Sequence, residues 1–435
     1  MSSRPTPVAA VQTRAHDRAE FAERWPVLLA QVTAAAEAGA RLIVVPEGTV
    51  PAYVIGTERV DPQQLERTAE DVIRVAARTG ATVVYGGARA DERGLANSAY
   101  VVTPSGIAGF ADKCFLWHFD RRWFTAGDAI EPVDTPAGRL GVFVCADGRI
   151  PTIGARLVAR GAEALVMPTA WVTSGRDPAA LENLQADLMA RVRARENGVP
   201  LIAANKCGVE ARSVAYCGKS QIVAADGTVV AIAPQDAETI LRATVAFAPS
   251  VAPRNVAASS VMRGTGAPLP AAARIAIACT ADARLRAVGA LADADVVLDA
   301  RDDPPAADAA IVDDAAVLDP RALVAPRLDG VRLFVWHARG GVEPAWVVPF
   351  ARTRAAELRA YLVVLDTVAA RAFAVDPDGV VLCGTFDAFA LAAFAFDRAR
   401  TDAWRVAPAT DVREGLVKME DLNARSAPVT GAHPS

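Results

Sequence analysis

The first 250 residues alternate short β-branched, apolar runs with stretches of helical periodicity, and this alternation restricts the chain to the α/β class. The predicted strands are residues 8–11, 41–45, 81–85, 140–145, 163–167 and 199–204. The predicted helices are residues 26–38, 64–78, 151–160 and 181–197. Two predicted hairpins, at residues 98–111 and 221–231, imply that the sheets are mixed rather than wholly parallel.

A similar order of elements begins again after an Ala-, Pro- and Ser-rich connector at residues 234–270, in which 239–245 is a candidate strand. The runs 274–278 and 295–298 repeat the spacing of the first two strands, and 331–335 resembles the strand that ends at Cys145. Residues 355–366 parallel 194–205. We therefore predict a shortened, diverged second copy. The predicted divisions are a first domain at 1–250, a linker at 251–270, the second copy at 271–415 and a tail at 416–435.

Composition limits the kinds of partner. The formal charge of -4 leaves no cationic excess for phosphates, so nucleic acid is not an expected partner. No apolar run approaches the ~20 residues of a membrane helix, and the N-terminus lacks the pattern of a secretory signal, so a cytoplasmic location is expected. Six scattered Cys and four His predict neither a disulfide framework nor a metal site, and no cofactor is expected.

Cys145 is the first candidate for chemistry. It closes an apolar strand and is followed by Ala146, Asp147 and Gly148, and then by a helix with Pro151 near its start. A thiol at the carboxyl end of a strand lies where α/β proteins bind ligands, and a helix N-terminus nearby would favour the thiolate. A buried, inert cysteine is the alternative if this residue is considered alone.

Two charged residues occupy comparable positions. Glu47 follows the buried strand 41–45, so its carboxylate should reach the same sheet edge as Cys145 and could act as a general base. Lys113 follows the strand 107–111 and is the only lysine before Lys206. Its ammonium could stabilise an oxyanion together with the backbone N–H of Ala146. Taken singly, each could also be a solvated loop residue.

Three motifs together resemble the nitrilase superfamily of carbon–nitrogen hydrolases: Pro46-Glu47-Gly48, Asp112-Lys113, and Cys145-Ala-Asp147-Gly-Arg149-Ile-Pro151. The resemblance covers roughly residues 6–248. It implies an αββα four-layer sandwich and a covalent thioester route. Carried onto this chain, it makes Cys145 the nucleophile, Glu47 the general base and Lys113 the electrostatic stabiliser.

This sequence departs from the family pattern at two positions. Asp120 stands where the family often has a second glutamate, and it is one methylene shorter, so its reach toward Lys113 is in question. Thr152 replaces a common glutamate at a predicted helix start. The pair Ala146-Asp147 resembles the amidase and carbamoyl-amide branches more than the true nitrilases, so small amides are the expected substrates, with water as the second reactant.

Further residues are candidates for the substrate pocket. Tyr53, Trp117 and Trp171 could form its walls, although packing in the core is the commoner role of such aromatics. Arg149 or Arg176 could hold a substrate carboxylate, with a structural ion pair as the alternative. Cys207 and Cys217 flank a presumed loop and are expected to be unpaired thiols.

The second copy is expected to be non-catalytic, because Trp336 aligns with Cys145 and no lysine occurs between Lys219 and Lys418. The resemblance suggests that it serves as a built-in pseudo-partner of the first half, with homo-oligomers as a further possibility. Three alternative functions stay open at this point: a nitrilase, an acyltransferase that passes the thioester to an amine, and a non-catalytic regulatory protein.

Overall fold

The computed structural model describes residues 3–173, 182–248, 261–284, 287–288, 293–301 and 303–425. The chain divides into two compact units. The first comprises Met1–Ala258 with Val342–Thr353, and the second comprises Ser259–Gly341 with Arg354–Ser435.

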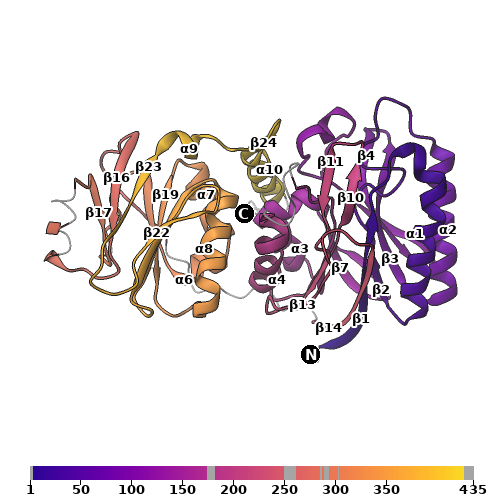
Figure 1. Ribbon diagram of the computed structural model, residues 1–435, viewed down its shortest axis with the longest axis horizontal. Coiled ribbons are helices and arrows are strands. Elements are labelled where there is room, and N and C mark those ends of the chain that lie inside the picture. Colours follow the sequence, from indigo (N-terminus) through magenta and orange to yellow (C-terminus); the bar gives the residue numbers. More distant parts are fainter. Residues whose placement is uncertain are drawn as a thin grey trace, which may run out of the picture. The chain divides into compact units, whose positions relative to one another are not determined.

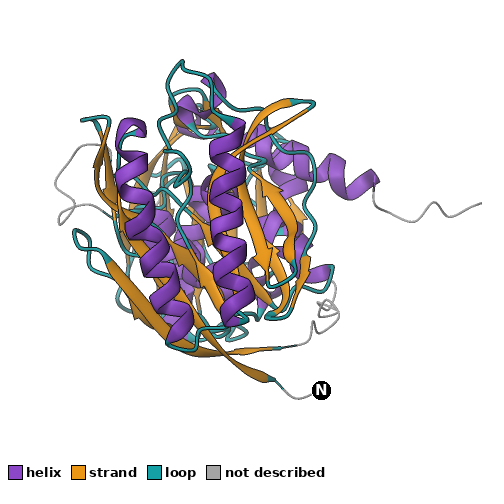
Figure 2. Cartoon of the chain, turned by 90° about the vertical axis from the view of Figure 1, so that its right-hand side faces the viewer, coloured by secondary structure: helices purple, strands orange, loops and turns teal. Residues whose placement is uncertain are grey.

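The first unit contains an eight-stranded sheet with the order β11-β10-β1-β2-β3-β4-β5, in which β14 also pairs with β1. The strands are β1 (Arg4–Arg14), β2 (Leu42–Val44), β3 (Thr82–Asp91), β4 (Gly94–Thr103), β5 (Gly106–Asp112), β10 (Lys206–Glu210), β11 (Val214–Cys217) and β14 (Thr239–Phe247). Helices α1 (Phe21–Glu37) and α2 (Pro62–Thr79) lie across this sheet in Figure 2. Val32, Val45 and Val72 belong to the apolar core between them.

A second, six-stranded sheet has the order β13-β12-β9-β8-β7-β6. Its strands are β6 (Val133–Thr135), β7 (Gly138–Val142), β8 (Ala164–Pro168), β9 (Leu201–Ala204), β12 (Gln221–Val223) and β13 (Val229–Ile232). Helices α3 (Pro151–Ala159) and α4 (Ala190–Asn197) accompany this sheet, so that two sheets lie between two helical layers (Figure 1). The predicted αββα sandwich is confirmed.

Helix α2 shows how the sequence sets the ends of these elements. The Asp61 side chain accepts a hydrogen bond from the Gln63 N–H, and Pro62 occupies the first turn, where no backbone donor is needed. Gly80 then ends the helix in the left-handed conformation, with φ of 74°.

Local reasoning missed the elements that depend on distant pairing. The presumed loop after Cys207 is a hairpin of β10 and β11, in which Cys207 lies opposite Cys217 and both remain free thiols. By contrast, the candidate strand at residues 239–245 of the expected connector is confirmed as β14, which pairs antiparallel with β1. Part of the predicted helix 181–197 is a π-helix at Gln185–Met189.

The second unit contains two sheets with the orders β15-β18-β19-β20-β21-β22 and β17-β16-β23, and a small pair, β24-β25. The strands are β15 (Val261–Arg263), β16 (Ala272–Ile277), β17 (Val296–Leu298), β18 (Ala309–Val312), β19 (Leu333–Ala338), β20 (Tyr361–Asp366), β21 (Arg371–Val375), β22 (Val381–Gly384), β23 (Ala392–Asp397), β24 (Arg405–Ala407) and β25 (Thr410–Asp411). Its helices are α6 (Asp314–Leu318), α7 (Arg321–Leu328), α9 (Arg398–Asp402) and α10 (Val412–Arg425). Helix α8 (Pro344–Leu358) is divided between the units, with its residues up to Thr353 in the first and the rest in the second. Ile277 and Leu298 of the smaller sheet share one apolar core with Val335 and Val363 of the larger.

The larger sheet of the second unit repeats the pairing pattern of the six-stranded sheet in the first. From β15 to β22 the pairings are antiparallel, parallel, parallel, antiparallel and antiparallel, as from β6 to β13. An irregularity in register even occurs at equivalent places, Ile222/Val223 and Ala374/Val375. The smaller sheet likewise repeats β1 with its parallel neighbour β2 and its antiparallel neighbour β14.

These pairings correct one part of the predicted internal alignment. The counterpart of β7 is β18 and not the strand at residues 331–335, because β7 and β18 each lie between an antiparallel and a parallel neighbour. Leu140 pairs with Ala164 and Ala309 pairs with Leu333, so the residue equivalent to Cys145, five positions on, is Asp314 and not Trp336. The alignment of 355–366 with 194–205 agrees with the pairing of β9 and β20.

Two predicted boundaries also differ from the structure. Strand β15 lies inside the expected linker and pairs with β18 of the second unit. Helix α10 covers the first ten residues of the expected tail. Strand β15 has only three residues, which is too short for a sequence pattern to identify.

Candidate active site

The ends of three strands bring Glu47, Lys113 and Cys145 together. Glu47 follows β2, Lys113 follows β5 and Cys145 comes shortly after β7, and all three are buried. The Lys113 Nζ lies 2.7 Å from Glu47 Oε1 and 2.6 Å from Asp120 Oδ2. One buried ammonium therefore bridges two buried carboxylates.

The charge of Lys113 follows from these neighbours. Burial by itself would lower the pKa of Lys113, but Asp120 and Glu47 outweigh burial, so this pKa lies well above its usual value. Lys113 is therefore an ammonium throughout the neutral range. It can neutralise negative charge that develops beside it.

Cys145 occupies a strained turn. Its φ of 47° is rare for a non-glycine residue and costs of order 1–3 kcal/mol, which the surrounding contacts must hold in place. Gln185 Nε2 donates to the Cys145 carbonyl at 2.8 Å, and the Asp147 N–H donates to the Val144 carbonyl at 3.0 Å. The turn thus fixes the nucleophile candidate at the sheet edge.

The surroundings of Cys145 favour its thiol over the thiolate that the sequence suggested. Burial and the neighbouring Glu47 carboxylate raise the pKa of Cys145 far above its usual value, although Lys113 acts in the opposite direction. A short 3₁₀ turn follows Cys145, and α3 begins only at Pro151, so the expected helix dipole lies farther away. The thiol is therefore protonated, and a base must remove its proton during the reaction.

Glu47 has one oxygen available for that task. Its Oε1 accepts hydrogen bonds from Lys113 Nζ and from Asn97 Nδ2, both at 2.7 Å, while its buried Oε2 has no hydrogen-bond partner in the structure. Gly86 allows the close approach of this segment, because a Cβ there would lie 2.4 Å from the Glu47 Cα. The free oxygen matches the role of general base.

Sequence reasoning missed Asn97. Its side chain holds Glu47, and its backbone carbonyl accepts from the Lys113 N–H at 2.8 Å, so it positions both charged groups. The signal was the polar pair Asn97-Ser98 inside the otherwise apolar, buried β4.

Asp120 reaches Lys113 in spite of its shorter side chain. It lies in a 3₁₀ turn, His118–Arg122, and its Oδ2 also accepts from the Trp117 N–H at 2.9 Å. Because the turn brings the Asp120 backbone close to Lys113, the shorter side chain still reaches the ammonium. The departure from the family pattern at this position therefore does not prevent the contact.

The predicted pocket residues have different outcomes. Tyr53 is buried, with its ring centre 5.8 Å from Lys113 Nζ, so it lies at the site. Trp171 is also buried, and its indole N–H has no partner, while its neighbour Ala170 hydrogen-bonds the Cys145 thiol through its backbone. Ala146 lies in the turn of Cys145 and is buried.

One of the two arginine candidates can be located in the structure. Arg149 lies over the Trp117 ring at 5.0 Å. The predicted carboxylate-binding alternative, Arg176, is outside the described residues.

A second buried lysine lies beside the first. Lys206 Nζ lies 2.9 Å from Glu210 Oε2 and donates to the Gly48 carbonyl at 2.8 Å. The Tyr216 hydroxyl donates to the same Glu210 oxygen at 2.8 Å. This network supports the loop after Glu47, and the sequence offered only the rarity of lysine as a signal.

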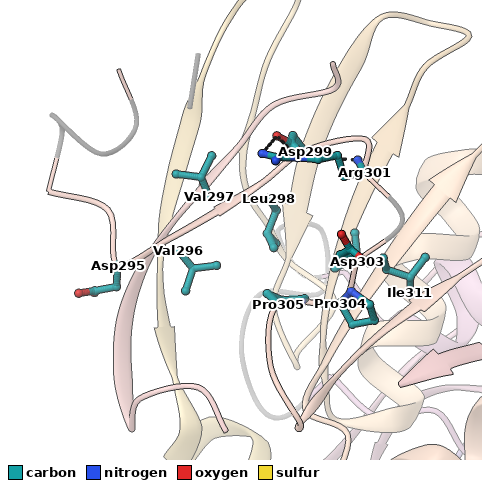
Figure 3. Close-up of a pocket in the computed structure, with 11 residues that line it drawn as sticks. Asp295, Val296, Val297, Leu298, Asp299, Arg301, Asp303, Pro304, Pro305 and Ile311 are labelled. Carbon is teal, nitrogen blue, oxygen red and sulfur yellow. Dashed lines mark hydrogen bonds and ion pairs between the residues drawn. The ribbon is translucent and has the colours of Figure 1, made fainter. Parts of the chain in front are cut away.

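The described residues of the second unit include no equivalent set. Arg301 lies three residues beyond the end of β17, as Glu47 lies three beyond β2, and it is paired with Asp299 at 2.8 Å. Figure 3 shows this pair in a pocket of about 380 Å³ that is also lined by Leu298, Ile311 and Val335. No nucleophile and base face each other there among the described lining residues.

The described part of the chain has neither a candidate metal-binding cluster nor a candidate membrane-spanning helix. No group of His, Cys, Asp and Glu side chains there could hold a metal ion. None of the helices described is long and apolar enough to cross a membrane.

Comparison with known proteins agrees with this geometry. Residues 7–251 match the model of the carbon–nitrogen hydrolase family. The chain belongs to the carbon–nitrogen hydrolase family.

Individual relatives span part of the chain. It is 29% identical over 175 residues to a probable nitrilase of Schizosaccharomyces pombe, covering 39% of this chain and 61% of that protein. It is 29% identical over 198 residues to an (R)-stereoselective amidase of Pseudomonas sp., covering 45% and 69%. The crystal structure of an amidase from Nesterenkonia sp. superimposes with a TM-score of 0.51 at 21% identity, covering 59% of this chain and 94% of that one, and this likeness concerns the fold.

Proposed function

We propose that the chain hydrolyses small amides through a thioester on Cys145. The observation that carries the proposal is the buried Lys113, which bridges Glu47 and Asp120 while Glu47 Oε2 stays unpartnered. The amidase name of one relative supports amides as substrates, while the nitrilase names of two others support nitriles as the alternative. Amide, water and a protonated thiol suffice as reactants, and no cofactor is needed.

In the proposed acylation, Glu47 Oε2 takes the thiol proton while the Cys145 sulfur attacks the amide carbon. The oxyanion is stabilised by Lys113 Nζ and the N–H of Ala146. Glu47 returns the proton to the leaving nitrogen, the C–N bond breaks and ammonia or an amine departs, which leaves the thioester.

In deacylation, Glu47 removes a proton from water, whose oxygen attacks the thioester carbon. The C–S bond breaks, the acid leaves, and the proton returns to Cys145. Asp120 holds Lys113 throughout. Tyr53 and Trp171 are proposed to contact the substrate.

We also propose that the second unit is a degenerate, non-catalytic copy. Its pairing pattern supports a duplication, and Asp314 and Arg301 in place of Cys145 and Glu47 support a loss of chemistry. Three further expectations stay predictions: the second unit serves as a built-in partner of the first, the chain forms homo-oligomers, and its location is the cytoplasm.

Ammonia release from a panel of small amides, N-carbamoyl amino acids and nitriles tests the proposed substrate class. We expect release from the aliphatic amides, with lower or no release from nitriles. A preference for nitriles would favour the nitrilase alternative. Transfer to added amines in place of hydrolysis would favour an acyltransferase, and silence across the panel would contradict the proposal in favour of a regulatory protein.

A further inference from the structure

The carboxylate of Asp147 connects the two segments that carry the proposed nucleophile and the lysine. It accepts hydrogen bonds from the N–H groups of Phe115 at 2.7 Å and Cys114 at 3.1 Å, which directly follow Lys113. It also accepts from the N–H of Val144 at 3.1 Å, which directly precedes Cys145. One buried side chain thus ties both segments together.

Burial disfavours the charged form of the Asp147 carboxylate. Asp147 is 2% exposed, and burial raises its pKa to about 7, while the N–H groups of Phe115 and Val144 and the charge of Lys113 act to lower it. Three backbone donors converging on one carboxylate leave its geometry little freedom. An apolar side chain that only filled the core would leave these three N–H groups without their acceptor.

A comparison with the second unit shows which contacts of the turn after Cys145 also occur where no nucleophile is present. In the first unit Arg193 pairs with Glu196 at 2.6 Å and donates from Nε to the carbonyl of Gly148 at 3.0 Å. In the second, Arg354 pairs with Glu357 at 2.5 Å and donates from Nε to Val317 at 2.7 Å.

Gly148 and Val317 are equivalent positions, three residues after Cys145 and Asp314. Both units therefore keep the buried Arg–Glu pair that supports the turn, whether or not a nucleophile is present. This support belongs to the fold.

Asp147 behaves differently. Its equivalent, two residues after Asp314, is Ala316, which has no carboxylate to offer. The described part of the second unit also lacks strands equivalent to β3, β4 and β5, and so lacks the segment that carries Lys113. The carboxylate is thus absent where the lysine and the nucleophile are absent.

We infer that Asp147 is a positioning residue that fixes Lys113 relative to Cys145. This inference rests on the proposed function, which it deepens. Asp147 does not touch the substrate; it acts through the backbone on both sides of the site. Displacement of the ammonium by ~1 Å would weaken oxyanion stabilisation and cost about a hundredfold in rate.

The test is the Asp147→Asn variant of the full-length chain. The amide keeps the shape but replaces one acceptor oxygen by a donor that faces backbone N–H groups. We expect kcat for amide hydrolysis to fall about 10- to 100-fold with KM nearly unchanged. Asp147→Glu, which keeps the charge but adds a methylene, should also lower kcat, because position rather than charge is altered.

A second measurement does not require activity. The rate at which iodoacetamide alkylates Cys145 is followed against pH by peptide mass spectrometry. The groups that act electrostatically on this thiol are Glu47, Lys113, Tyr53 and Tyr216. Because Lys113 lowers the pKa of Cys145, its displacement in Asp147→Asn should shift the alkylation profile to higher pH.

The matched control is Asp376→Asn in the second unit. Asp376 is a buried carboxylate that accepts from the N–H groups of Asp378 and Val380, both at 2.9 Å. The control should lower stability without changing kcat or the profile. The inference would be overturned if folded Asp147→Asn kept both the kcat and the alkylation profile of the wild type. If the wild type were inactive on every amide but the variant still shifted the alkylation profile, only the proposed function would be contradicted.

Discussion

Replacement of Lys113 by methionine is expected to lower kcat for amide hydrolysis about 10²- to 10³-fold and to destabilise the fold by about 3–5 kcal/mol. The first effect is the loss of a preorganised positive charge at the developing oxyanion. The second arises because Glu47 and Asp120 are fully buried and would lose the ammonium that both contact. Activity assays and urea denaturation measure the two effects separately.

Lys219→Met is the control for this prediction. Lys219 pairs with Asp187 at 2.7 Å, but both side chains are partly exposed, so solvent screens the pair. We expect this control to change stability by less than about 1 kcal/mol and to retain activity. Equal behaviour of the two variants would contradict the role given to Lys113.

The substitution Glu47→Gln is expected to reduce kcat about 10²- to 10⁴-fold while the protein stays folded. Glutamine keeps an oxygen that can accept from Lys113 and Asn97, but it cannot take the Cys145 proton. Because the resting thiol is protonated, no alternative thiolate is available at neutral pH. Steady-state kinetics with circular dichroism tests the prediction.

Glu37→Gln serves as the comparison, since Glu37 is more than half exposed at the end of α1 and pairs with Arg78 at 2.9 Å. It should behave as wild type. Full activity of Glu47→Gln would contradict the proposal that Glu47 is the general base.

The positions of Glu47, Lys113 and Cys145 could be predicted because each follows a recognisable strand. Strands β2 and β5 end at the same edge of the eight-stranded sheet, which brings Glu47 and Lys113 together. The expectation that Cys145 lies at that same sheet edge is wrong, because β7 belongs to the six-stranded sheet, and the packing of one sheet on the other brings Cys145 to the site. The αββα sandwich could be predicted from the alternation of strands and helices together with the resemblance to the nitrilase superfamily.

The protonation of Cys145 could not be predicted in this way. Desolvation depends on how completely other segments cover the thiol, and that is a property of the packed structure. Asn97, Asp147 and the short turn that carries Asp120 were missed for a similar reason, because their roles depend on hydrogen bonds between segments distant in sequence.

The alignment of the second half with the first shows another limit of prediction from sequence. Its strands are short and rich in Ala and Val, so residues 331–335 could be aligned with either of two neighbouring strands. Strand pairing settled the choice in favour of β18 as the equivalent of β7. Where longer patterns were available, as at residues 355–366, the sequence alignment agreed with the structure.

The central claim is a thioester on Cys145, and it is tested most directly by acid quenching during turnover of a small amide. The mass of the peptide that contains Cys145 is then measured, alongside ammonia release by wild type and Cys145→Ser. We predict a peptide heavier by the mass of the amide less ammonia, and release that disappears in the variant. Comparable release by both proteins, with the Cys145 peptide unmodified, would contradict the account.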